Sequence, residues 1–576
     1  MPPRAPTALT LALLPLLLFA VQGVAFIRAN TETYDEAMHL AAGYSYLVTR
    51  DFRLEPQNPP LVKAYLALPV LLAYRLPFAP DPRHWRDAKA FLIGHAFLYS
   101  SPVHAATLIT VSRLANLLLG VLLVALVGVW AGRLWGRRAA LLAMALASLE
   151  PNLVAHASLV TTDVGFTLFV FATLYALWEY LRAPGWGLLA AAGATTGMAL
   201  ASKFSAVLLL PMIGALVVLS PLVAGRSFRL PPARDPVTRR HALLQSAAVL
   251  LVVLAVALAT VAAAYAFQGA EPWLAGFGRF LELGRGGQWA FFMGEHDYRG
   301  WWSYFPVAFL IKTPLGSLAL IAASVVLHRA GSPLALRDAT FLALPVLALF
   351  AAMTQSTVNI GLRHVLPVYP LLFVLASRLA TLDLGRRWAP RLLVGAPLLL
   401  TAAASLGIAP HHLAYFNTLV GGPDGGHRYL LDSNLDWGQD LKGVKAYMER
   451  EGLPIVYLSY FGTAPPEYYG IRYQYVPGSW PLEWPPPDDR VPADAPRKVL
   501  AISVNNLQAL PSPGNPLFGW LRSRRPVARI GHSILVYDLT DDRDGLAKLE
   551  ETYARAGVRT LEAARDRPGE PPAAGR

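Results

Sequence analysis

The sequence predicts a polytopic α-helical membrane protein with about eleven transmembrane helices and a small α/β domain at its C-terminal end. Only 15% of its 576 residues are charged and 55% are hydrophobic, with a mean hydropathy of +0.40. A soluble globular chain has about 25% charged residues, and a bilayer disfavours charge because lipid cannot solvate it. The apolar residues also gather in runs of about 20, the length with which a helix crosses a membrane.

The predicted spans follow one another along the first 410 residues. They are 8–27, 105–131, 139–159, 164–181, 187–201, 204–224, 244–267, 304–327, 339–356, 364–380 and 391–409. The first run follows Arg4 and has no obvious small-residue cleavage site, so we interpret it as an uncleaved span. The run 60–78 is interrupted by charged residues and prolines, which predicts a helix lying in the membrane interface.

The charges of the connections predict the orientation. With the N-terminus in the cytoplasm, each inner connection is basic, as the positive-inside rule requires. The arginines concerned are Arg133, Arg137, Arg138, Arg182, Arg226, Arg229, Arg234, Arg239, Arg240, Arg329, Arg337, Arg378, Arg386, Arg387 and Arg391. This distribution explains the net charge of +13 without a nucleic-acid partner. We expect a multi-pass protein of the plasma (inner) membrane whose C-terminal domain is extracytoplasmic.

Three domains are expected: 1–410 in the membrane, 411–562 as a small α/β domain, and 563–576 as a disordered tail. The strand candidates are short runs rich in β-branched and aromatic residues. They are Ile455–Phe461, Val499–Val504 and Ile534–Leu539, with a helix expected over Gly438–Arg450 and a proline-rich loop over Pro477–Pro496. The chain has no cysteine, so it has neither disulfides nor thiolate metal sites.

Several acidic residues collect on the expected outer side. Asp35, Glu36 and His39 follow the first span within one helical turn and offer a general base, a titrating group and metal-type ligands. Asp163 lies at the outer end of a hairpin between two spans, at the same expected depth. Each of these residues is also consistent with simple capping of a juxtamembrane helix.

Cations are expected at the same level. Lys203, Lys312, Arg363 and His364 each stand near the outer end of a span. A single one of them needs no more explanation than snorkelling to the interface. Several cations facing carboxylates are better explained by a bound anion, and a lipid phosphate fits because arginine offers a fork matched to phosphate oxygens.

The run Asp432–Asp440 begins the C-terminal region and contains Asn434, Asp436 and Trp437. Its carboxylate, amide and indole groups suit sugar binding, and they equally suit a hydrogen-bonded helix cap. Dinucleotide, zinc and serine-elbow motifs are absent from the sequence, and Asp424, Asp432 and Asp436 are wrongly spaced for an Asp-x-Asp motif of the nucleotide-sugar type. An enzyme that faces outward also lacks access to cytoplasmic nucleotide sugars, so any sugar donor would have to arrive attached to a lipid.

In the order and spacing of its motifs, the chain resembles lipid-carrier-dependent membrane glycosyltransferases of the C-type superfamily. The similarity is strongest to the bacterial protein O-mannosyltransferase and aminoarabinose transferase group. The motifs are Tyr34-Asp35-Glu36 with His39 and Gly43, Asn58-Pro-Pro-Leu-Val-Lys63, Ala155-His156 to Thr162-Asp163, Lys203-Phe-Ser205, Tyr304-Phe-Pro306, Lys312-Thr-Pro314, Arg363-His364 with Pro367, and Asp432–Asp440.

The resemblance implies inverting transfer of a sugar from a polyprenyl-phosphate donor to a hydroxyl acceptor, which would be a protein, lipid or glycan. Asp35 would act as the base, with Glu36 and Asp163 in support. It further implies donor-phosphate contacts from Lys203, Arg363, His364 and Lys63, and substrate contacts from His39, Asn434, Asp436 and Trp437. Many bacterial relatives have Glu-His where this chain has Gln57-Asn58, so a need for a divalent cation, Mg²⁺ or Mn²⁺, stays open.

Two other classes of function are alternatives to the glycosyltransferase prediction. A transporter or lipid flippase places ionisable groups near the bilayer midplane and often contains internal repeats. Here no repeat is found, and the spans between 105 and 267 carry few charges at their centres. A non-catalytic scaffold would have no need for acids and bases at one depth. The sequence therefore favours a glycosyltransferase, with transport as the alternative.

Overall fold

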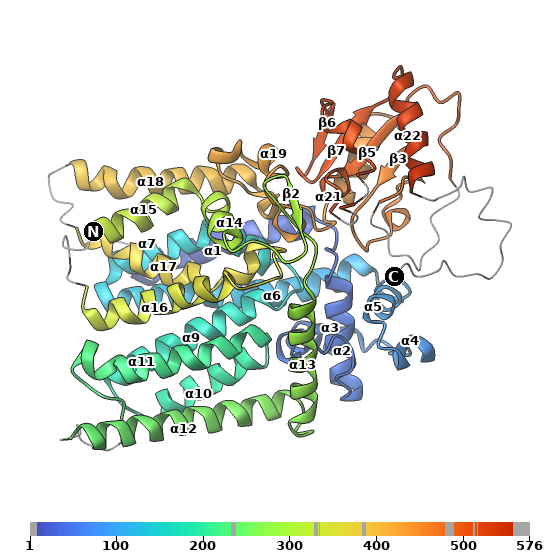
Figure 1. Ribbon diagram of the computed structural model, residues 1–576. Coiled ribbons are helices and arrows are strands. Elements are labelled where there is room, and N and C mark those ends of the chain that lie inside the picture. The colour runs from blue at the N-terminus through green and yellow to red at the C-terminus, as the bar shows by residue number, and fades with distance from the viewer. Residues whose placement is uncertain are drawn as a thin grey trace, which may run out of the picture.

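The computed structural model describes residues 8–231, 238–327, 332, 334–382, 388–478, 489–510, 513–514 and 516–556. Long helices lie side by side in one body, and a small sheet domain covers one end of them (Figure 1). This arrangement confirms the predicted fold class of a helical membrane domain followed by a small domain containing a sheet. The expected tail, 563–576, lies outside the described residues, as does much of the proline-rich segment.

The first half of the membrane domain contains α1 (Ala8–Ala29), α2 (Glu36–Thr49), α3 (Pro60–Tyr74), α4 (Pro82–Arg86), α5 (Ala90–Tyr99), α6 (Ala105–Trp135), α7 (Arg137–Ser148), α8 (Pro151–Ala157), α9 (Asp163–Arg182), α10 (Trp186–Leu200), α11 (Leu209–Ala224) and α12 (Arg239–Ala264). The second half contains α13 (Glu271–Gly286), α14 (Tyr304–Lys312), α15 (Leu315–Val326), α16 (Leu336–Met353), α17 (Val368–Ser377) and α18 (Trp388–Ile408).

Within the described residues, six helices are long and apolar enough to cross a membrane. Two bent pairs, α7 with α8 (66°) and α14 with α15 (112°), raise the number to eight if each pair is one span. Each of the eleven predicted runs falls on a helix or on one of these pairs, and the runs on α10, α17 and α18 form shorter apolar helices. The count of eleven crossings remains a prediction.

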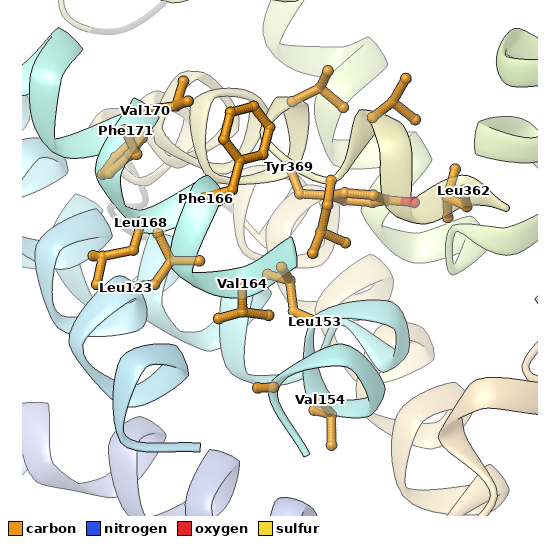
Figure 2. Close-up of a cluster of buried hydrophobic side chains, with 14 of the residues drawn as sticks. Leu123, Leu153, Val154, Val164, Phe166, Leu168, Val170, Phe171, Leu362 and Tyr369 are labelled. Carbon is orange, nitrogen blue, oxygen red and sulfur yellow. The ribbon is translucent and has the colours of Figure 1, made fainter. Parts of the chain in front are cut away.

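Close helix packing depends on small residues at several contacts. On α10, a Cβ added to Gly197 would lie 2.5 Å from the carbonyl oxygen of Ala257 on α12. Helices in lipid gain little from the hydrophobic effect, so such close backbone approach supplies much of their attraction. Toward the centre, α9 buries Val164, Phe166 and Phe171 among neighbouring helices (Figure 2). This packing fixes the start of α9, where Asp163 lies.

The segment between α12 and α14 is more ordered than the sequence predicted. The expected outer loop, 268–303, contains helix α13 and a hairpin of β1 (Ala290–Phe292) and β2 (Glu295–Asp297). Helix α13 runs across the direction of the long helices, at the end that carries the sheet domain (Figure 1). The hairpin contacts the C-terminal region through an isolated bridge between Phe292 and Leu430.

The C-terminal domain is built on a five-stranded mixed sheet of order β4-β3-β5-β7-β6. Strand β3 pairs in parallel with β4 and β5, whereas β7 is antiparallel to β5 and β6. Its elements are α19 (Pro423–Gly426), α20 (Leu441–Arg450), β3 (Val456–Ser459), β4 (Tyr473–Tyr475), β5 (Val499–Ser503), α21 (Val504–Leu507), β6 (Ala528–Ile530), β7 (Ile534–Asp538) and α22 (Arg543–Arg555). The three predicted strands and the predicted helix are all present, whereas β4 and β6 were not predicted.

Candidate functional site

Asp35 lies at the start of α2, where the chain contacts the C-terminal region. It precedes α2, and the extended segment before it is hydrogen-bonded to the segment that follows the last membrane helix. The amide of Thr31 donates to the carbonyl oxygen of Gln439 (2.8 Å), and the amide of Tyr34 donates to that of Trp437 (2.9 Å). These bonds fix Asp35 against the C-terminal region, about 400 residues further along the chain.

A cavity of about 520 Å³ opens beside Asp35. Its charged members are Asp35, Arg363 and Asp432, and its remaining wall is largely aromatic. The other lining residues are Tyr34, Phe91, Gly287, Gln288, Trp289, Tyr298, Ile360, Trp437, Phe461 and Leu510. Such a combination of an apolar wall with a few convergent charges is typical of ligand sites.

Arg363 connects the charges of this site. Its Nη1 lies 3.7 Å from Oδ2 of Asp35 and 3.8 Å from Oδ2 of Asp163. Its guanidinium also stands 4.4 Å from the ring centroid of Trp437, a cation–π arrangement. Neither carboxylate contact is as short as a charge-assisted hydrogen bond. The guanidinium therefore keeps donors for an anion entering the cavity.

Lys203 is a second cation that contacts Asp163. Its Nζ donates to Oδ1 of Asp163 over 2.6 Å. Asp163 is thus held between Lys203 and Arg363 and has a buried side chain, while Asp35 keeps 21% of its side-chain surface exposed. Neither Lys203 nor Asp163 lines the cavity. They hold Arg363 in place rather than face the cavity themselves.

The acids that face the cavity hold protons more readily than usual. Burial raises the pKa of Asp35 above its ordinary value, and Arg363 partly opposes that rise. Burial likewise raises the pKa of Asp432 to about 6, against the lowering effects of Arg363 and of the Ser433 amide. A carboxylate with a raised pKa is a better proton acceptor, which is the property of a general base.

The side chain of Glu36, the neighbour of Asp35 in the sequence, is buried and fully hydrogen-bonded. Both its oxygens accept from Arg113, over 2.8 Å and 2.5 Å. It also accepts from the amides of Thr33 and Val160, each over 2.7 Å. With its acceptor sites filled and its side chain fully buried, Glu36 has no free contact to offer a substrate.

His39 and Lys63 belong to a second buried network, centred on Glu55. Nδ1 of His39 lies 2.7 Å from Oε2 of Glu55, and Nζ of Lys63 lies 3.3 Å from the same oxygen. Asn58 donates to the other carboxylate oxygen over 2.5 Å. Burial opposes ionisation of Glu55, but His39 and Lys63 together lower its pKa to about 2. Glu55 is therefore a carboxylate at any physiological pH.

Glu55 also lines a second cavity, of about 600 Å³, together with Arg53, Lys89 and Arg279. Tyr34 and Phe91 line both cavities, and their rings meet edge to face with centroids 5.5 Å apart. The two cavities thus share one aromatic pair in their walls. Within the described residues, no three His, Asp or Glu side chains are grouped as metal ligands. The Lys63 ammonium already occupies the cationic position beside Glu55, so the residues around Glu55 do not fit a resident cation.

Of the substrate residues predicted in the C-terminal region, one lines the cavity and the other two are buried away from it. Trp437 lines the cavity, but Asn434 is buried and bonded to the amide of Leu362 and the hydroxyl of Tyr304. Asp436 is also buried and accepts from the amides of Gly438 and Asn505. Asn434 therefore positions the segment that carries Arg363 rather than facing the cavity.

His364 and Lys312 lie behind the cavity wall. Nε2 of His364 is buried without a hydrogen-bond partner, and its ring contacts Phe305 edge to face. Nζ of Lys312 donates to the carbonyl oxygens of Leu413, Tyr415 and Asn434. Lys312 thus ties the membrane helices to the start of the C-terminal region.

Among the acidic residues at these cavities that the sequence did not predict as site residues are Glu55 and Asp432. Both adopt a positive φ (53° and 57°), a backbone feature that no pattern of residue types reveals. Asp432 is the first residue of the Asp432–Asp440 motif, but the substrate residues predicted in that motif are Asn434, Asp436 and Trp437. Two aromatic residues, Trp289 and Tyr298, were missed because they lie on the hairpin segment that was expected to be a loop.

Comparison with known proteins supports the class of this molecule. Residues 104–270, from the start of α6 to the end of α12, match the family model described as Dolichyl-phosphate-mannose-protein mannosyltransferase. The matched segment contains Asp163 and Lys203. The chain is therefore similar to membrane glycosyltransferases of the C-type superfamily, as its motifs predicted.

Solved structures that match this chain include ArnT from Cupriavidus metallidurans in the apo state, with 15% sequence identity and a TM-score of 0.46. That match covers 91% of this chain and 97% of ArnT. ArnT bound to undecaprenyl phosphate matches with 14% identity, a TM-score of 0.44 and the same coverage. The Archaeoglobus fulgidus oligosaccharyltransferase in the apo form matches with 14% identity and a TM-score of 0.41, over 68% of this chain and 56% of that one. The comparison with curated proteins gave no match.

Proposed function

We propose that this protein is an inverting glycosyltransferase that moves a sugar from a polyprenyl-phosphate donor to a hydroxyl acceptor. The observation that carries the proposal is the pairing of Asp35 with Arg363 at the wall of one cavity. Such a reaction needs a base for the acceptor and a fixed cation for the leaving phosphate. The family match over 104–270 supports the choice of glycosyl transfer among reactions with these needs.

In the proposed step, the acceptor hydroxyl gives its proton to Asp35. The acceptor oxygen attacks the anomeric carbon from the face opposite the phosphate and forms the new glycosidic bond. The bond between the anomeric carbon and the phosphate oxygen breaks, and its electron pair stays on the phosphate. The phosphate thereby gains one negative charge, which the guanidinium of Arg363 lies ready to stabilise. The products are the glycosylated acceptor and polyprenyl phosphate, with the proton on Asp35.

The other predicted site residues receive supporting roles in this proposal. Asp163 and Lys203 orient Arg363 through the contacts described above. Glu36 fixes the backbone before α2 through Arg113, and Asn434 and His364 support the Arg363 segment from behind. The aromatic wall, with Trp437 and Trp289, offers faces for a sugar ring.

We also propose that the cavity faces the extracytoplasmic side of the inner membrane. The basic connections lie at the opposite ends of the helices in the predicted topology, and the positive-inside rule assigns those ends to the cytoplasm. A lipid-linked donor is then the form of activated sugar available to the site. The N-terminus would be cytoplasmic and the sheet domain extracytoplasmic.

The test is transfer of radiolabelled sugar from a panel of polyprenyl-phosphate sugars in proteoliposomes containing an acceptor extract. The wild-type protein and the Asp35→Asn variant are assayed in parallel. A product that requires both the wild-type protein and one donor would establish the activity and name the sugar. Failure of every donor with folded protein would overturn the proposal, and solute or lipid flux would then be measured.

A further inference from the structure

An arginine-rich cavity lies in the C-terminal domain, separate from the charges around Asp35. It measures about 400 Å³ and lies between the α19 turn and the β6–β7 edge of the sheet. Five arginines line it, and no carboxylate does. They are Arg428, Arg522, Arg524, Arg525 and Arg529, accompanied by His427, Leu507, Gln508, Ser523, Pro526, Leu535 and Tyr537.

Three of these arginines have no acidic partner among the described residues: Arg428, Arg522 and Arg525. The other two are already paired. Arg524 contacts Asp542 and Asp544, and Arg529 lies 3.9 Å from Asp424. Unpaired cations repel one another across a confined space, so their convergence costs stability unless an anion binds between them.

His427 provides an independent sign of a ligand. Its side chain lines the cavity and is only 7% exposed, yet its Nδ1 has no hydrogen-bond partner in the protein. Burial lowers the pKa of His427 to about 4, and the nearby Arg529 and Arg428 contribute to that decrease. The imidazole is therefore neutral at physiological pH, and its Nδ1 is a buried hydrogen-bonding position that no protein group fills. A buried polar group without a partner is costly.

We infer that this cavity is a binding site for a phosphate-type oxyanion, held by Arg428, Arg522 and Arg525 beside the neutral imidazole of His427. Arginine matches phosphate because its planar fork donates two parallel hydrogen bonds to neighbouring oxygens. The same chemistry is offered by a soluble phosphate compound and by the headgroup of an anionic phospholipid at the membrane surface.

The cavity is coupled to the site at Asp35 by one short segment. Leu507 and Gln508 line the arginine cavity, whereas Leu510 lines the cavity beside Asp35. The same segment carries Asn505, whose side-chain oxygen accepts from the amide of Asp432 over 3.0 Å. An anion that orders this segment would also order the wall of the other cavity. This link holds whether or not the protein transfers sugars.

The experiment measures pyrophosphate binding by isothermal titration calorimetry to the full-length protein in nanodiscs of neutral phosphatidylcholine. The variant Arg522→Gln/Arg525→Gln removes two cations that have no carboxylate partner, so it leaves no buried acid unpaired. The matched control is Arg490→Gln/Arg543→Gln, which removes two exposed arginines of the same domain that line neither cavity. Pyrophosphate bound at Arg363 is common to all three proteins and cannot produce a difference between them.

We expect the Kd to rise at least about tenfold in the cavity variant and to stay within about twofold in the control. Nanodiscs containing phosphatidylglycerol then distinguish the source of the anion. If the lipid headgroup occupies the site, phosphatidylglycerol weakens pyrophosphate binding in the wild type but not in the cavity variant. If phosphatidylglycerol leaves pyrophosphate binding by the wild type unchanged, the natural ligand is a soluble phosphate compound. Equal pyrophosphate binding by the wild type and the cavity variant would overturn the inference, and so would the absence of binding by both proteins.

Discussion

Asp35 and Glu36 are neighbours in the chain, but they lie in two different electrostatic environments. Asp35 keeps 21% of its side chain exposed to a cavity and has a long contact of 3.7 Å to Arg363. Glu36 is fully buried, and its contact to Arg113 is 2.5 Å. Both are acidic residues opposite an arginine, so residue type alone does not separate them.

The difference between the two pairs lies in unused hydrogen-bonding capacity. Glu36 accepts from Arg113, Thr33 and Val160, and so its environment is complete without a ligand. Asp35 and Arg363 have room between them, and the space beside them is a cavity. A pair with satisfied partners supports structure, whereas a loosely held pair facing a cavity is free to change partners during a reaction.

The largest effect is expected at Asp35. Asp35→Asn keeps the side chain's shape but removes the proton acceptor, so sugar transfer should fall about 10³-fold. The melting temperature in detergent should stay near that of the wild type, because the side chain makes no short hydrogen bond. Transfer at the wild-type rate by a folded Asp35→Asn protein would contradict the assignment of the base.

Replacing the neighbouring residue should instead affect stability. Glu36→Gln leaves the buried guanidinium of Arg113 without a counter-charge, which costs on the order of 3 kcal/mol. The melting temperature should drop, and the surviving folded protein should keep most of its activity per molecule. The matched comparison is Asp35→Asn, measured in the same detergent. A Glu36→Gln protein that is stable and inactive would assign Glu36 to the reaction.

A somewhat smaller effect on transfer is expected at Arg363. Arg363→Lys keeps the positive charge but loses the planar fork and the stacking on Trp437. Transfer should fall about 10²-fold, and the change should appear in the dependence on donor concentration more than on acceptor concentration. Steady-state kinetics with each substrate varied in turn would measure it. An equal effect on both substrates would indicate that Arg363 only shapes the cavity.

The smallest effect concerns the pH dependence of stability at Asp432. Its pKa is about 6 in the folded protein, above the ordinary value of 3.8, so ionisation of this carboxyl destabilises the fold. This loss of folding free energy is fully present above pH 6 and disappears as the pH falls toward 4. Asp432→Asn should therefore stabilise the protein at pH 8, by on the order of 1 kcal/mol, but not at pH 4. Thermal unfolding at both values tests this, and a gain that is the same at both would contradict it.

The membrane fold was largely predictable because lipid imposes a simple rule on composition. A helix that crosses a bilayer must be apolar along its whole length, so each predicted run falls on a helix or a bent pair in the structure. The bends in α7–α8 and α14–α15 were not predicted, although Pro151 and Pro314 stand at the breaks. Proline marks where a helix can break, but packing decides the angle.

The charged residues of the candidate site were predictable, whereas the groups that each of them contacts were not. The motif containing Asp35 and the motif containing Arg363 were both identified, and these two residues line one cavity. Glu55 and Asp432 were missed because their positions depend on the path of loops rather than on periodicity. His39 and Lys63 were expected at a substrate, but Glu55 engages both of them.

The sequence by itself therefore determined the class of fold, the strands at the centre of the small domain, and the set of acids and cations available for chemistry. These follow from local properties: apolar length, β-branched runs and residue type. Only the tertiary structure decided which acid faces a cavity, which acid is sealed by Arg113, and which arginines converge in the C-terminal domain. Those outcomes depend on contacts between residues that are hundreds of positions apart, as with Tyr34 and Trp437, and a hydrogen bond across such a distance leaves no pattern in a single sequence.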